Sequence, residues 1–171
     1  MRSRGKTVGA VKKLAHRETK LKLVVQYATA SKDLPTRQQF RKWVKAALMQ
    51  DAEIVLRIVD EDEGRSLNRD FRDRGKDCAT NVLTFVDDEI GVAAYDDTHP
   101  LSGDIALCAT VVEKEAKQQH KKLMAHYAHL TVHGVLHLQG RDHENDANAA
   151  VMERLETEIV TKLGFDDPYK G

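Results

Sequence analysis

Three histidines have the spacing of a metal site in the segment HGVLHLQGRDH, residues 133–143. On an α-helix, His133 and His137 are about 40° apart around the axis and about 6 Å apart along it, so both imidazoles project from one face. Gly140 can adopt the left-handed conformation that ends a helix, which lets the chain turn back and deliver His143 as a third ligand. Three imidazole nitrogens suit one Zn²⁺ ion and leave its fourth position open, as in catalytic sites. The motif therefore predicts a zinc site on a helix and the turn after it.

Two more histidines lie on the same stripe, one and two turns earlier. A lone histidine on such a helix is more often a structural residue than a ligand, and we interpret His126 and His129 in that way. Spacing alone leaves open a second ligand set, made of His129, His133 and His137.

The spacing of the motif also occurs in the metzincin metalloproteases, whose pattern is HExxHxxGxxH. Their glutamate takes a proton from zinc-bound water, and Gly134 stands in its place here. Hydrolysis of a peptide or amide bond would need a base from elsewhere and is the weaker hypothesis. Gly134 could instead let another backbone or a substrate approach the metal. Asp142 is a candidate to orient an imidazole or to cap the next helix.

The hydrophobic pattern around the motif predicts a chain of both strands and helices. We expect strands at residues 21–29, 53–60, 81–86 and 104–108, and helices after Pro35 and at 111–120, 123–138 and 145–163. The charged connection over residues 60–80 has room for a short helix around Leu67 and Phe71. Residues 87–103 form an acidic excursion, for which a hairpin connection and a further edge strand are the alternatives. The helix after Pro35 has an apolar stripe that we expect in the core, made of Phe40, Trp43, Val44, Ala47 and Leu48.

Length and composition favour one soluble domain. The chain has 171 residues, of which 41% are hydrophobic and 32% charged. It contains no run near the ~18 to 20 apolar residues that cross a bilayer, and its N-terminus has no apolar segment typical of a secretory signal. Cys78 and Cys108 form neither a disulfide framework nor a thiolate zinc motif, so we expect reduced thiols.

Charge is unevenly distributed along the chain. The 27 basic and 27 acidic side chains cancel, yet residues 1–22 hold eight basic side chains and one acidic one, which leaves a net charge of −7 on the remainder. We interpret residues 1–20 as a basic N-terminal arm outside the core. A solvated tail, an arm that contacts RNA and, less favoured, an organellar transit segment are the alternatives.

Three motifs occur in an order that resembles the YbeY family, bacterial metal-dependent endoribonucleases of rRNA maturation. They are RGKDCATNVLTF (residues 74–85), SGDIALC (102–108) and HGVLHLQGRDH (133–143). The resemblance covers about residues 21–165. It implies an α+β fold for residues 21–171, a single compact domain with a mixed sheet of about four strands covered by helices. It also implies one zinc ion held by His133, His137 and His143.

The resemblance further implies cytoplasmic action on single-stranded RNA, with no membrane partner. The expected substrate is the 16S rRNA precursor at its 3′ end, and the expected partners are the small ribosomal subunit and its assembly proteins, with a role in ribosome quality control. The family's functional arginine corresponds to Arg74, because RGKDCATNVLTF then aligns without a gap; Arg72 is the other candidate. A guanidinium group can hold two phosphate oxygens as negative charge develops on them.

Two other functions remain open on the sequence. One is a zinc-containing ribosome-assembly factor without nuclease activity of its own, and the other is a zinc hydrolase of peptide or amide bonds. Normal 16S rRNA ends in a metal-site mutant would favour the first, and cleavage of unstructured peptides but not RNA would favour the second.

Deletion of residues 1–20 tests the basic arm. If the arm contacts phosphates, the plot of log K for RNA binding against log salt should become less steep, because fewer counterions are released on binding. Binding titrations at several salt concentrations measure this slope. An unchanged slope would mean that the arm is a solvated tail.

Overall fold

A four-stranded mixed sheet forms the base of the molecule. The computed structural model describes residues 18–69, 80–86, 99–140 and 146–170. The strands are β1 (Leu21–Ala28), β2 (Ala52–Val59), β3 (Val82–Val86) and β4 (Leu101–Cys108), in the spatial order β1-β2-β4-β3. Strands β1, β2 and β4 are parallel, and β3 pairs antiparallel with β4. This confirms the predicted α+β class with a mixed sheet of about four strands.

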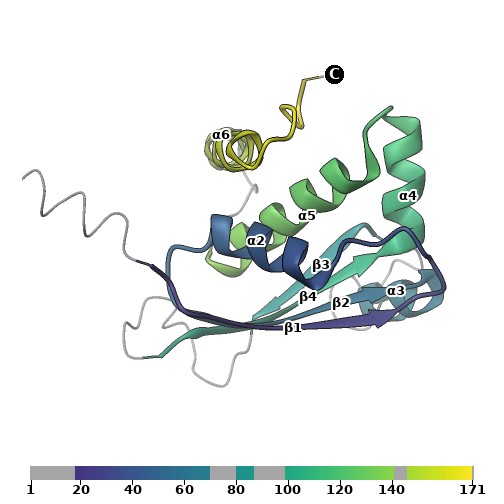
Figure 1. Ribbon diagram of the computed structural model, residues 1–171, viewed down its shortest axis with the longest axis horizontal. Coiled ribbons are helices and arrows are strands. Elements are labelled where there is room, and N and C mark those ends of the chain that lie inside the picture. Colours follow the sequence, from purple (N-terminus) through teal and green to yellow (C-terminus); the bar gives the residue numbers. More distant parts are fainter. Residues whose placement is uncertain (1–17, 70–79, 87–98, 141–145, 171) are drawn as a thin grey trace, which may run out of the picture.

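Two of the helices lie over one face of this sheet (Figure 1). The described residues form the helices α2 (Arg37–Ala47), α3 (Glu61–Leu67), α4 (Ala109–Gln118), α5 (Leu123–Leu138) and α6 (Asp146–Lys162). Figure 1 shows α2 and α5 above the sheet, α4 beyond its end and α6 on the outer side of α2 and α5. Helix α5 packs against β3, β4, α2, α4 and α6 and is therefore the centre of the fold.

Helix α2 forms where its sequence predicts it. Thr36 caps its N-terminus in a capping box, in which the Gln39 amide donates to the Thr36 hydroxyl at 3.1 Å and the Thr36 amide donates to the Gln39 side chain at 2.8 Å. The whole predicted apolar stripe is buried, and the Phe40 ring meets Tyr127 of α5 edge to face at 6.3 Å. The stripe thus joins α2 to α5, as expected of a core face.

Strand β4 is longer than predicted. It begins at Leu101 and not at residue 104, so the end of the acidic excursion belongs to the sheet. Ser102 and Gly103 belong to the predicted acidic excursion, but a Cβ atom at Gly103 would lie 2.8 Å from Leu138 Cδ2 and 3.0 Å from the Phe85 carbonyl oxygen. The glycine is therefore a strand residue at which α5 and β3 approach β4 closely.

The short helix of the charged connection begins earlier than predicted. Helix α3 spans residues 61–67, and its first turn holds Glu61, Asp62 and Glu63, which favour a helix N-terminus. Leu67 ends this helix, while Phe71 lies outside the described residues. Residues 1–17 of the predicted arm, residues 87–98 of the acidic excursion and Cys78 lie outside them too.

No helix in the described part of the chain combines the length and the apolar character needed to cross a membrane.

Two glycines at the contact between α5 and the sheet give a stability test. A Cβ atom at Gly134 would lie 3.3 Å from Ile105 and 3.4 Å from Thr84, which is looser than the contact at Gly103. We expect Gly103→Ala to lower the free energy of unfolding by about 1 to 3 kcal/mol through overpacking. Gly134→Ala should change it by less than about 1 kcal/mol, because the helix propensity of alanine offsets the crowding.

Urea denaturation of the two variants measures both values. Equal losses in the two variants would contradict the close approach at Gly103.

Candidate metal centre

Two histidines form the accessible side of an otherwise buried turn of α5. Between Thr131 and Gln139, every residue except His133 and His137 is buried. The two ring centroids lie 4.9 Å apart, with the ring planes inclined by 64°. The structure therefore brings together the first two predicted ligands on one rigid element.

The helix ends where the motif predicts. After Leu138 the chain passes to Gly140, which has φ +88° and donates its amide to the His137 carbonyl oxygen at 3.0 Å. This left-handed residue ends the helix directly after the two histidines. The third predicted ligand, His143, lies outside the described residues.

The donors that are described fit a zinc ion, since imidazole nitrogens at i and i+4 suit that metal. Within the described ranges, no group of three or more His, Cys, Asp or Glu side chains is placed to hold a metal ion. The alternative set of His129, His133 and His137 is therefore wrong, because all three residues are described. A complete site needs a ligand from outside the described residues, where His143 stays the prediction.

His126 and His129 are structural residues, as the sequence analysis favoured. His126 is buried and donates from Nε2 to Glu115 Oε1 at 2.9 Å. Burial lowers the pKa of His126, and the hydrogen bond to Glu115 opposes that shift. His129 is also buried and donates from Nε2 to Glu156 Oε1 at 2.6 Å.

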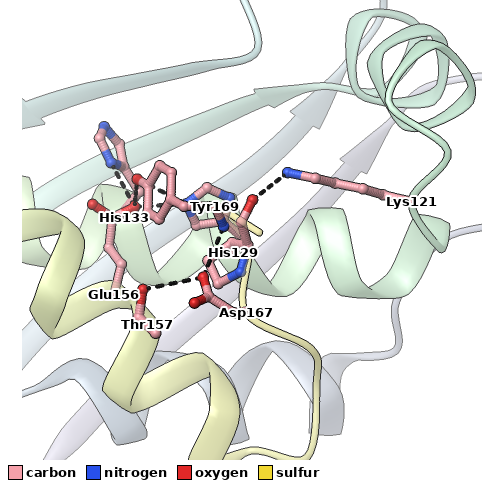
Figure 2. A network of polar contacts seen from close by, with 8 residues as sticks. Lys121, His129, His133, Glu156, Thr157, Asp167 and Tyr169 are labelled. Atoms are coloured by element: carbon pink, nitrogen blue, oxygen red, sulfur yellow. Dashed lines mark hydrogen bonds and ion pairs between the residues drawn. The ribbon is translucent and has the colours of Figure 1, made fainter. Parts of the chain in front are cut away.

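Glu156 is the residue near the site that the sequence analysis missed. It lies on α6 between Met152 and Val160, and each of these three residues is only 1% exposed. Besides His129, its Oε1 atom accepts a hydrogen bond from His133 Nδ1 at 3.1 Å (Figure 2). The signal in the sequence was an acidic residue at the middle position of an i, i+4, i+8 apolar stripe.

The environment of Glu156 keeps its carboxylate charged. Burial alone would raise the pKa of this group, but the hydrogen bonds from His129 and His133 outweigh burial and lower the pKa to about 2. The carboxylate is therefore an acceptor for every donor that surrounds it.

The C-terminal segment delivers one more donor to this carboxylate. The Tyr169 hydroxyl donates to Glu156 Oε1 at 2.8 Å, and burial together with this carboxylate raises the pKa of Tyr169. The segment is held by the Tyr169 amide, which donates to Asp167 at 2.9 Å, and by Lys121, which donates to the Pro168 carbonyl at 2.7 Å (Figure 2).

Gly134 faces the sheet, at Ile105 and Thr84. The idea that it makes room for a backbone or substrate at the metal is therefore replaced by a packing role. A glutamate at this position would start toward those two side chains, so a base of the metzincin kind would have to displace the helix from the sheet. Asp142, Arg72 and Arg74 lie outside the described residues.

Comparisons with known proteins show which family this chain resembles. The sequence model of the YbeY family, described as Endoribonuclease YbeY, matches residues 25–164. Endoribonuclease YbeY of Nitrosomonas europaea is 61% identical over 152 residues, which cover 89% of this chain and 87% of that protein. Endoribonuclease YbeY of Nitrosospira multiformis is 61% identical over 161 residues, which cover 89% and 83%.

A solved structure extends the likeness to the fold. The solution structure of TM1509 from Thermotoga maritima is similar to this chain with a TM-score of 0.55 and 26% sequence identity, over 88% of this chain and 99% of that one. The family model covers most of the chain, and the two relatives from Nitrosomonas europaea and Nitrosospira multiformis are each 61% identical to it. The chain therefore belongs to the YbeY family, as the order of its three motifs predicts.

Proposed function

We propose that the protein is a zinc-dependent endoribonuclease that cleaves single-stranded RNA. Its substrate is the 16S rRNA precursor, at the 3′ end, and it acts in the cytoplasm with the small ribosomal subunit and its assembly proteins. The same activity serves ribosome quality control. Membership of a family of endoribonucleases supports the reaction class, which is hydrolysis of an RNA phosphodiester bond.

The observation that carries the proposal is the pair of imidazoles at the end of α5. The ring centroids of His133 and His137 lie 4.9 Å apart. The helix ends directly after them at the left-handed Gly140, after which the chain can turn back toward the ion with His143. We assign these three histidines as the ligands of one zinc ion. A zinc ion bound there would supply Lewis-acid chemistry, which activates water and polarises a phosphoryl oxygen.

The protein's own contribution to the chemistry is position and charge. Helix α5 is buried among three helices and two strands, which fixes where the two imidazoles point. We assign Arg74 to the non-bridging phosphate oxygens, where a guanidinium group can stabilise the charge that develops in the transition state.

Substitution of His137 tests the metal and the reaction together. We expect His137→Ala to lose its zinc and to cleave single-stranded rRNA at least about 100-fold more slowly, since loss of a ligand should exceed the effect of losing one of its outer partners. Metal analysis and a 3′ end assay on precursor 16S rRNA measure both effects. His120→Asn is the control, because His120 is exposed at the turn before α5 and has φ +54°, which asparagine tolerates.

Other results would favour the other functions. A folded, metal-free His137→Ala that cleaves RNA as fast as the wild type would contradict the proposal. Cleavage of unstructured peptides without cleavage of RNA would indicate a zinc peptide or amide hydrolase, and normal 16S rRNA ends in cells that carry only the mutant would indicate an assembly factor. The product ends identify the nucleophile, because attack by the 2′-hydroxyl leaves a cyclic phosphate and attack by water does not.

The arginine assignment has its own test. Arg74→Ala should lower kcat by about 100- to 1,000-fold, as does removal of a group that stabilises transition-state charge, while zinc content stays unchanged. Arg74→Lys should restore little of this loss, because an ammonium group lacks the two-pronged geometry of guanidinium. Single-turnover cleavage assays of both variants, with Arg72→Ala beside them, measure the effect. A large loss in Arg72→Ala and none in Arg74→Ala would assign the role to Arg72.

A further inference from the structure

A buried carboxylate in an apolar helix stripe requires an explanation. Glu156 is 1% exposed, between Met152 and Val160 on the inner side of α6. Removing a charged carboxylate from water is unfavourable unless hydrogen bonds replace its hydration. A leucine at this position would fill the stripe at no such cost, so the carboxylate has a partner that an apolar side chain could not serve.

Three donors surround one oxygen of this carboxylate. Glu156 Oε1 lies 2.6 Å from His129 Nε2, 2.8 Å from the Tyr169 hydroxyl and 3.1 Å from His133 Nδ1. These partners come from the middle of α5 and from the C-terminal segment, and Figure 2 shows them converging on the carboxylate. Two of them are wholly structural groups, whereas the third is a residue that we assign as a zinc ligand.

The hydrogen bond to His133 decides which nitrogen of that ring can bind a metal. A charged carboxylate only accepts hydrogen bonds, so the proton of a neutral His133 ring is on Nδ1. The Nε2 atom then has the lone pair, which is the form in which imidazole coordinates a metal. A carboxylate behind a histidine ligand also fixes the ring orientation and makes the coordinating nitrogen more basic.

A second carboxylate–histidine pair on the same helix provides a comparison. Glu115 of α4 accepts from His126 Nε2 at 2.9 Å, two turns before His133. This pair also joins a carboxylate to an imidazole, but it does so through Nε2, and His126 is buried and is not an assigned ligand.

We propose that Glu156 is a positioning residue for the zinc site, which holds His133 in the Nδ1-protonated tautomer and thereby strengthens metal binding through Nε2. This inference rests on the proposed zinc site of His133, His137 and His143. It adds to that site a residue of α6 that the ligand motif does not contain.

Zinc affinity of matched variants tests the role of Glu156. We expect Glu156→Gln to bind Zn²⁺ about 10- to 100-fold more weakly than the wild type, which is the usual effect of losing such a partner. Glu115→Gln should bind Zn²⁺ within about twofold of the wild type, because it removes a carboxylate from a histidine that is not a ligand. Competition with a chromophoric chelator at one fixed pH measures the affinities, and circular dichroism shows that each variant is folded.

A second measurement needs no variant at Glu156. In the zinc-loaded wild type, long-range ¹H–¹⁵N spectra of the histidine rings, assigned with His133→Asn, should show His133 with its proton on Nδ1 and its metal on Nε2. The proposal is overturned by a proton on Nε2 of His133, by coordination through Nδ1, or by a folded Glu156→Gln that binds zinc as tightly as the wild type. If the wild type itself binds no zinc, the proposed function fails and this inference fails with it, whereas equal affinities in the two proteins contradict the inference alone.

Discussion

The burial of α5 on nearly every side is the constraint on which the rest of the structure depends. Eleven of its 16 residues are buried, and it contacts two strands and three helices. Because α5 is buried around most of its circumference, it lies inside the core, and the sheet, α2, α4 and α6 surround it. His133 and His137 are half-buried members of this helix and share its rigidity. A metal site gains from such support, because ligands that need not be ordered on binding lose less entropy.

The end of α5 is fixed from two further directions. The Gln139 side chain donates to the Ala47 carbonyl at 2.8 Å and accepts from the Met49 amide at 2.7 Å, which ties the helix end to the connection between α2 and β2. On the sheet side, the missing side chain of Gly103 lets Leu138 pack directly over β4. These contacts fix the position of the C-terminal end of α5.

Local patterns in the sequence predict the helices and strands well. They predict poorly those residues whose type is explained by a partner on another element. The four strands, the bounds of α5 and the apolar stripe of α2 follow from periodicity and capping residues that lie within one segment. The first residues of β4 and the carboxylate of α6 do not, because Gly103 is explained by Leu138 and Glu156 by His129 and His133, which are distant in the sequence. In both cases a residue that looks unfavourable for its element is favourable for a partner on another element. The order of the three family motifs supplied the fold class that periodicity alone left open.

The spacing of the histidines of α5 likewise does not predict their different roles. His126, His129, His133 and His137 follow one another at spacings of three and four, so helical geometry places all of them along one stripe. Carboxylates on α4 and α6 then separate their roles. Glu115 and Glu156 each engage Nε2 of a buried ring, while His133 meets Glu156 through Nδ1 and reaches the accessible side together with His137. The ring atom that faces a carboxylate, rather than the spacing in the sequence, therefore distinguishes His126 and His129, which are bound through Nε2, from His133, whose Nε2 atom we propose as a zinc ligand.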